Sequence, residues 1–92
     1  MILNFQHKGL ENFATKGDRS KVQQAHIPKI KLILTRLNAA TSAEQMNQPG
    51  YAFHQLKGGL KGFFAVKVSG NWRIIFRFEG ENAIDVDYID YH

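Results

Sequence analysis

The sequence contains no cysteine, which excludes disulfide bonds and thiolate metal ligands. It has only two prolines, and no apolar run approaches the roughly 20 residues that a transmembrane helix requires. Residues 1–5 form too short an apolar stretch for a secretory signal peptide, and they lack a basic start. We therefore expect a cytoplasmic protein that does not associate with membranes.

Acidic residues are scarce in most of the chain. Residues 1–77 hold all twelve lysines and arginines but only three acids, a net charge of +9, whereas residues 78–92 carry a net charge of −5. A basic surface favours a polyanionic partner such as nucleic acid. It is equally compatible with a solvated surface that only aids solubility, so charge alone leaves both interpretations open.

The length of 92 residues and the 43% apolar content predict one domain, residues 1–92, with a single core. Apolar periodicity and capping patterns predict helices in the first half of the chain. The expected elements are a short strand at residues 2–5, helices at 9–16 and 27–38, and one further short helix that opens with a capping box at 41–44 and ends at 49–50.

The second half of the chain predicts an antiparallel meander with three-residue loops at 69–71 and 80–82. Centring the pairing on these loops places apolar residues opposite each other on one face. The expected pairs are Phe64 with Phe76, Val66 with Ile74, Val68 with Trp72, Phe78 with Ile84, Phe76 with Val86 and Ile74 with Tyr88. The other face then carries Lys67, Arg73 and Arg77. The fold class is therefore α+β, an antiparallel sheet packed on N-terminal helices.

A further strand is expected at residues 51–56, just before this meander. The five-residue loop at 57–61 allows two registers, which send His54 to opposite faces of the sheet. The sequence does not decide between them.

Several polar side chains suit RNA cleavage. That reaction needs a base for the ribose 2′-OH, cations for the charge on the phosphorane, and an acid for the leaving 5′-oxygen. The candidate catalytic residues are His54, Lys57, Arg73, Asp90, Tyr91 and His92. Each has a structural alternative: His54 as an ordinary strand residue, Arg73 as the partner of Asp85 or Asp87, and His92 as an idle chain end.

The histidines do not predict a metal site. His7, His26, His54 and His92 include no pair four residues apart on a helix, and no cysteine accompanies them. The adjacent Gly58 and Gly59 lack the spacing of a phosphate-binding loop. We therefore expect neither a metal nor a cofactor.

Short motifs in the second half occur in a specific order that ends the chain. They are Pro49-Gly50, His54-Gln55-Leu56-Lys57-Gly58, Gly62, Asn71-Trp72-Arg73-Ile74 with Phe76 and Phe78, and Asp90-Tyr91-His92. Together they resemble the HigB toxins, a branch of the RelE-like ribosome-dependent ribonucleases, and the resemblance runs the full length of the chain. It implies the microbial ribonuclease fold and cleavage of mRNA in the ribosomal A site, which blocks translation.

The resemblance also implies residue roles. His54 and His92 would be the proton-transfer pair in an order not assigned, Lys57 and Arg73 would hold the phosphate, and Asp90 and Tyr91 would orient it. The expected RNA-binding cations are Lys57, Lys61, Lys67, Arg73 and Arg77. Gln55 replaces a proline that is frequent in the family, which affects the stiffness of the loop but removes no chemical group.

The implied partners are a HigA-like helix-turn-helix antitoxin, the 70S ribosome and mRNA. This chain has no recognition-helix pattern of its own, so we expect no direct DNA binding without the antitoxin. The alternative function is a non-catalytic RNA-binding module or an inactive toxin relative. The complete set of His54, Lys57, Arg73 and His92 favours the nuclease, because a binder needs positive charge but not that combination.

Overall fold

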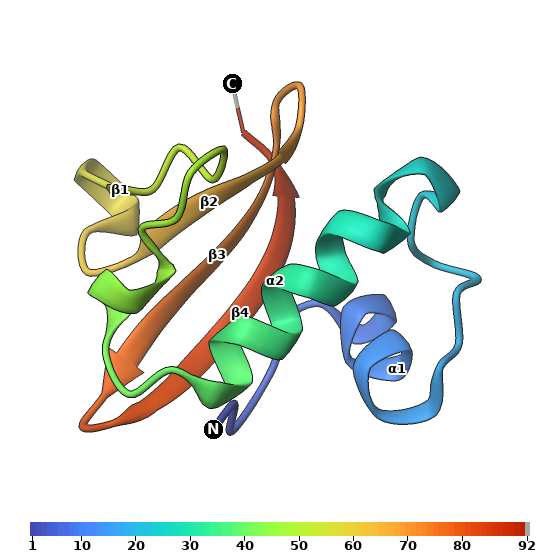
Figure 1. Ribbon diagram of the computed structural model, residues 1–92, viewed down its shortest axis with the longest axis horizontal. Coiled ribbons are helices and arrows are strands. Elements are labelled where there is room, and N and C mark those ends of the chain that lie inside the picture. Colours follow the sequence, from blue (N-terminus) through green and yellow to red (C-terminus); the bar gives the residue numbers. More distant parts are fainter. Residues whose placement is uncertain (92) are drawn as a thin grey trace.

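The computed structural model describes residues 1–91 and shows two helices beside an antiparallel sheet (Figure 1). The elements are α1 (Lys8–Lys16), η1 (Gln24–His26), α2 (Ile27–Ala39), η2 (Ala43–Met46), β1 (His54–Gln55), η3 (Gly58–Leu60), β2 (Phe64–Ser69), β3 (Trp72–Glu79) and β4 (Asn82–Asp90). The strands follow the order β1-β2-β3-β4, and each neighbouring pair is antiparallel. The predicted α+β class is confirmed. The candidate His92 lies outside the described residues.

The predicted helices at 9–16 and 27–38 are present as α1 and α2. The His7 Nδ1 atom accepts the Leu10 amide at 2.9 Å and caps the start of α1. Gly17 ends that helix with φ +72, a left-handed conformation that glycine adopts without a Cβ clash. In α2, proline lies within the first turn, where its missing N–H has no helical partner to lose. The apolar stripe of α2 is buried as the periodicity predicts: Ile27, Ile30, Ile33, Leu34 and Leu37.

The predicted third helix is only the single turn η2, and the predicted capping box is wrong. Thr41 exchanges hydrogen bonds with Gln45, not with the expected Glu44. The Thr41 amide donates to Gln45 Oε1, and Gln45 Nε2 donates to the Thr41 hydroxyl, both at 3.0 Å. This exchange satisfies the groups that a capping box would have used.

The N-terminal segment lies beside β4 in parallel orientation. Ile2 bridges to Ala83 and Phe5 bridges to Val86 as two isolated pairs, so the strand predicted at residues 2–5 is reduced to these contacts. The Leu3 amide donates to the Ala83 carbonyl at 2.9 Å. The segment therefore covers the edge of β4, which would otherwise expose unpaired backbone groups.

The first hairpin follows the predicted register away from its turn. Phe64 pairs with Phe76 and Lys67 pairs with Arg73, as expected. At the turn, however, Trp72 pairs with Ser69, not with Val68, because Val68 is the extra residue of a β-bulge. The loop is correspondingly two residues long and begins with Gly70 at φ +56, the positive φ that such tight turns need at this position.

The second hairpin is shifted by one residue near its turn. Phe78 pairs with Ala83, so Ala83 enters the core where Ile84 was expected. A bulge then restores the predicted register, and Ile74 pairs with Tyr88. The bulge includes Asp85, whose φ of +53 is unusual for a residue other than glycine.

Hydrogen bonds to its carboxylate hold Asp85 in this conformation. Oδ1 accepts Asn4 Nδ2 at 2.8 Å and Gln6 Nε2 at 2.9 Å, while Oδ2 accepts Arg77 Nη2 at 2.6 Å and Arg77 Nε at 3.1 Å. We call this arrangement the Asp85 clamp. Its hydrogen bonds, that from Asn4 first, lower the pKa of Asp85 below the ordinary 3.8.

The Asp85 clamp predicts a specific loss of stability in acid. The pKa is lower in the folded than in the unfolded state, so the stabilisation is present above about pH 4 and disappears as the pH falls through the folded pKa. Asp85→Asn should therefore melt below the wild type at neutral pH, and the gap should close in strong acid. Circular dichroism melts across this pH range measure it. A gap independent of pH would show that the carboxylate charge contributes nothing.

The two faces of the sheet differ in what covers them. The helix face, on which α2 lies in Figure 1, carries the main core with Val66, Ile74 and Phe76. The opposite face, here called the outer face, holds a second cluster in which Leu56, Ala65 and Ile75 are buried; Leu60, Phe63, Ile89 and Tyr91 pack against them. The sequence predicted a charged second face bearing Lys67, Arg73 and Arg77. The structure shows in addition that this face has an apolar floor, which the cluster forms.

Within residues 1–91, no helix has the length and apolar character needed to span a membrane.

Candidate active site

The structure places His54 on the outer face. His54 pairs directly with Ala65, and residues opposite each other in an antiparallel pair point to the same side of the sheet. Ala65 in turn pairs with Ile75 on the outer face. The histidine itself is exposed, so its ring borders the apolar floor without being buried in it. The register that the sequence left open is thereby determined.

A short local contact orients the His54 ring. Its Nδ1 atom lies 3.0 Å from the Ala52 carbonyl oxygen. Because a carbonyl only accepts, the hydrogen bond requires the proton on Nδ1, and Nε2 of the neutral ring is then a proton acceptor. Ala52 has φ +47, and the preceding carbonyl of Tyr51 accepts the Lys67 amide at 2.7 Å. An unusual backbone conformation thus accompanies a ring orientation in which Nε2 can accept a proton.

Two cations lie directly opposite each other on the outer face, and one of them, Lys67, is a near neighbour of His54. Lys67 pairs with Arg73 across β2 and β3, and both belong to the outer face. Like charges in such a pair destabilise a sheet unless an anion lies between them. Lys67 is two residues beyond Ala65, which makes it a diagonal neighbour of His54 at roughly 7–8 Å between Cα atoms. A phosphate bound between the two cations would relieve the repulsion.

The Arg73 side chain folds back onto the hairpin turn. Its Nη1 donates to the Gly70 carbonyl at 2.7 Å and to the Trp72 carbonyl at 3.1 Å, while the buried Nε has no hydrogen-bond partner within residues 1–91. The structural alternative for Arg73 is wrong, because Asp85 pairs with Arg77 and Asp87 accepts its neighbouring Tyr88 amide. Neither carboxylate neutralises the Arg73 guanidinium.

The remaining candidate cations lie at the other end of the outer face. Leu56 donates its amide to the Phe63 carbonyl at 2.9 Å, so the loop that carries Lys57 and Lys61 leaves β1 near Phe63. Arg77 lies over the Phe63 ring. The sequence grouped Lys57 with Arg73, but the structure separates them. His54, Ala65 and Ile75 form a row across β1, β2 and β3, and the two cations lie on opposite sides of it.

The chain end contributes one residue to this face. Tyr91 packs against the outer-face cluster, and its amide donates to the Asn71 carbonyl at 2.8 Å. Asp90 is exposed and pairs with Trp72, whose ring packs on the helix-face core. Because paired residues point to the same side of a sheet, Asp90 is on the helix face and Tyr91 is on the outer face. Of the terminal candidates within the described residues, Tyr91 alone is on the outer face.

Two other histidines belong to the helix face. His26 is buried, and its Nδ1 lies 2.6 Å from the Tyr88 hydroxyl, while His7 caps α1. Burial raises the pKa of Tyr88 above its ordinary value, so the phenol stays protonated. The sequence did not identify this pair. Among residues 1–91, no three histidine, aspartate or glutamate side chains are placed to share a metal ion.

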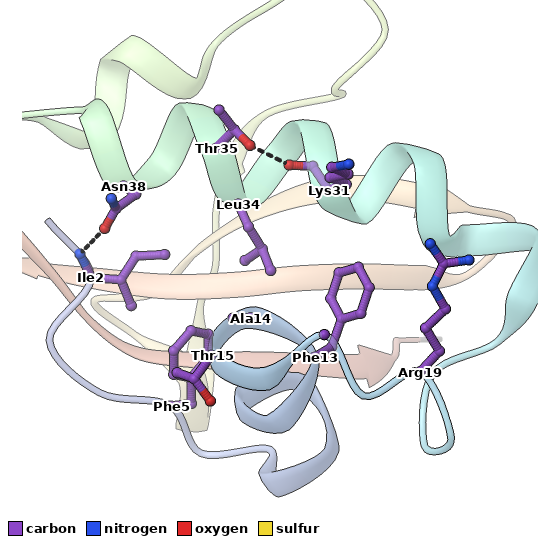
Figure 2. Close-up of a pocket in the computed structure, with 11 residues that line it drawn as sticks. Ile2, Phe5, Phe13, Ala14, Thr15, Arg19, Lys31, Leu34, Thr35 and Asn38 are labelled. Atoms are coloured by element: carbon purple, nitrogen blue, oxygen red, sulfur yellow. Dashed lines mark hydrogen bonds between the residues drawn. The ribbon is translucent and has the colours of Figure 1, made fainter.

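A hollow of about 510 Å³ lies between α1, α2 and the N-terminal segment (Figure 2). Figure 2 shows apolar side chains at its floor, including Phe13 and Leu34, with Lys31 and Arg19 at its rim. Its lining contains no histidine and no acid, so it holds no group suited to proton transfer near neutral pH. It lies on the helix side and is separate from His54.

Comparisons with known proteins cover the whole chain. A family described as "RelE-like toxin of type II toxin-antitoxin system HigB" matches residues 3–92. The chain is similar to "Endoribonuclease HigB" of Proteus vulgaris, with 37% identity over 92 residues and full coverage of both chains. It is also similar to "Toxin HigB-1" of Vibrio cholerae serotype O1, with 31% identity over 98 aligned residues that cover all of this chain and 98% of the relative.

Proposed function

Because the chain belongs to the RelE-like HigB toxins of type II toxin–antitoxin systems, we propose that it is an endoribonuclease that cleaves mRNA in the ribosomal A site and so blocks translation. The observation that carries this proposal is the orientation of His54. Its Nδ1 bond to Ala52 leaves Nε2 as the proton acceptor of the neutral ring, on the face that holds Lys67 and Arg73, and neither cation has a carboxylate partner within residues 1–91. A protein that only bound RNA would need the charge but not the base.

The proposed reaction is general acid–base attack by the ribose 2′-OH. His54 Nε2 takes the proton of the 2′-OH, and the resulting oxygen attacks the adjacent phosphorus. Arg73 stabilises the negative charge on the phosphorane, with Lys57 contacting the RNA backbone further along. His92 then donates a proton to the leaving 5′-oxygen. The products are a 2′,3′-cyclic phosphate and a 5′-hydroxyl, and neither a metal nor a cofactor takes part.

The other terminal residues would shape the site without exchanging a proton. Tyr91 packs on the apolar floor and limits how the ribose can lie beside His54. Asp90 lies at the end of β4, where we propose that it fixes the chain end and thereby the position of His92.

The exposure of the site supports the proposal of ribosome dependence. His54 and Lys67 are exposed on a sheet face, outside the hollow of Figure 2, so the protein alone does little to position a flexible RNA strand. The ribosomal A site would hold the mRNA in the geometry that attack requires. The cytoplasm, which contains translating ribosomes, is the corresponding location.

A type II toxin has a cognate antitoxin, and we propose a HigA-like helix-turn-helix protein in that role. DNA binding would then belong to the partner.

The proposed function is tested by incubating the protein with mRNA in the presence and absence of translating ribosomes and mapping the cut ends. We expect cuts within A-site codons only when ribosomes are present. Rapid cutting of free mRNA would contradict ribosome dependence. RNA binding without cleavage under either condition would instead support the non-catalytic binding module.

Arg73→Ala should abolish growth arrest on expression. The change removes a cation of the outer face and breaks two hydrogen bonds to turn carbonyls, so the unfolding free energy should fall by about 1–3 kcal/mol. Growth assays beside circular dichroism melts measure both effects, and Arg36→Ala, an exposed cation of α2, is the matched control. Loss of toxicity that tracks unfolding would show a structural role for Arg73.

A further inference from the structure

Phe63 and Arg77 form a stack on the outer face that no step of the proposed reaction uses. The guanidinium carbon of Arg77 lies 5.4 Å from the centroid of the Phe63 ring. Phe63 packs against the apolar floor and is only partly buried, and the Arg77 side chain is 44% exposed. The pair is therefore accessible to solvent, with the apolar floor beneath Phe63.

The plane of this guanidinium is fixed. The Asp85 carboxylate binds Nε at 3.1 Å and Nη2 at 2.6 Å, which occupies one edge of the fork. The clamp itself is held by Asn4 and Gln6 from the N-terminal segment. An arginine whose charge is already paired attracts a phosphate less than Arg73 does, but its flat surface remains available for stacking.

The stack lies next to the proposed cleavage site. His54 lies in a row with Ala65 and Ile75 across the sheet. Phe63 precedes Ala65 by two residues and Arg77 follows Ile75 by two, so the Phe63–Arg77 pair lies next to this row on the same face. That row spacing is roughly 7 Å. The loop that carries Lys57 and Lys61 begins beside Phe63, where these cations can contact the RNA backbone.

We propose that the Phe63–Arg77 stack is a nucleobase-binding subsite for the RNA residue adjacent to the cleaved phosphate. This inference rests on the proposed function. The base lies flat on the guanidinium, which is sandwiched against the phenyl ring, as arginine planes and aromatic rings do in single-stranded RNA recognition. Arg77, expected from the sequence as one more phosphate contact, then binds a base, and Asp85 is its positioning residue. Because every base has a π face, the subsite accepts all four bases.

The test combines base removal with side-chain removal. Single-turnover cleavage is measured on programmed ribosomes with an abasic ribonucleotide placed in turn at each position around the cut. For the wild type, one position should lower the rate by about 5- to 100-fold, the contribution of one stacked base. Phe63→Leu should cleave intact RNA more slowly by the same factor, and an abasic residue at the sensitive position should not lower its rate further. Phe63→Tyr should behave like the wild type, and Arg77→Lys like Phe63→Leu.

Phe13→Leu is the matched control, because it makes the same change at a partly buried ring on the helix side. It should keep the full sensitivity to the abasic position. Absence of a sensitive position in the wild type, or persistence of the sensitivity in Phe63→Leu, would overturn the inference.

A second measurement is independent of cleavage. An uncleavable 2′-O-methyl RNA carrying 2-aminopurine at one position in turn is bound to programmed ribosomes and titrated with protein, and stacking should quench its fluorescence for the wild type but not for Phe63→Leu. If the wild type cleaves no RNA, the proposed nuclease function is wrong. The quenching measurement still tests base binding by the Phe63–Arg77 pair in that case. Absence of quenching at every position would overturn the subsite even in an active nuclease.

Discussion

Replacing His54 with glutamine is expected to lower the single-turnover cleavage rate by about 10²–10⁴-fold, the usual effect of losing a general base. Glutamine keeps a polar side chain of similar reach, but its amide does not take up a proton near neutral pH. The side chain is exposed, and within residues 1–91 it bonds only the Ala52 carbonyl, so the fold should be preserved. Rate measurements on programmed ribosomes, beside circular dichroism melts, separate the two effects.

Gln55→Ala is the matched control for this prediction. Gln55 is the other residue of β1 and is equally exposed, but it pairs with Phe64 and so points away from the outer face. Its replacement should leave the rate near that of the wild type. A His54→Gln protein within about tenfold of the wild-type rate would show that another group is the base.

Removal of His92 is expected to cost a similar factor, about 10²–10⁴-fold in rate. This expectation rests on the family resemblance, which makes His92 the partner of His54 in proton transfer. The fold should hardly change, because the pairing of β4 with β3 ends at Asp90. His92→Gln should be almost as damaging as deletion, because it too cannot transfer a proton near neutral pH.

Tags provide a further check on the chain end. A C-terminal extension should impair cleavage by crowding a site built on the last residue, and the same extension at the N-terminus should not. The deletion variant decides the question. If it retains more than about a tenth of the wild-type rate, His92 is not the acid.

The helices and the order of the strands could be predicted because each depends on local patterns. The buried stripe of α2 has helical spacing, and the apolar alternation of β2 and β3 fixes their register over most of the hairpin. The two bulges could not be predicted. That at Asp85 depends on hydrogen bonds from Asn4 and Gln6, which are 81 and 79 residues away in sequence.

For the candidate site, too, the sequence does not predict what depends on distant residues. Its motifs suggested His54, Arg73 and Tyr91 as candidates, but the arrangement of these residues could not be predicted. The face that His54 occupies depends on the positive φ of Ala52, for which the sequence offers no glycine as a sign. Leu56 follows β1 and Tyr91 follows β4, the first and last strands of the sheet, yet both belong to the apolar floor. A cluster of residues so far apart in the sequence cannot be predicted from local sequence patterns.

The chemistry of the cut ends tests most directly whether this protein cleaves RNA through the ribose 2′-OH. Programmed ribosomes are incubated with wild-type protein, and the termini of both fragments are identified by mass spectrometry. A 2′,3′-cyclic phosphate on the upstream fragment and a 5′-hydroxyl on the downstream fragment are expected, because the 2′-oxygen is the nucleophile. A 3′-hydroxyl with a 5′-phosphate would contradict the mechanism, because water would then have attacked the phosphorus and His54 would have no 2′-OH to deprotonate.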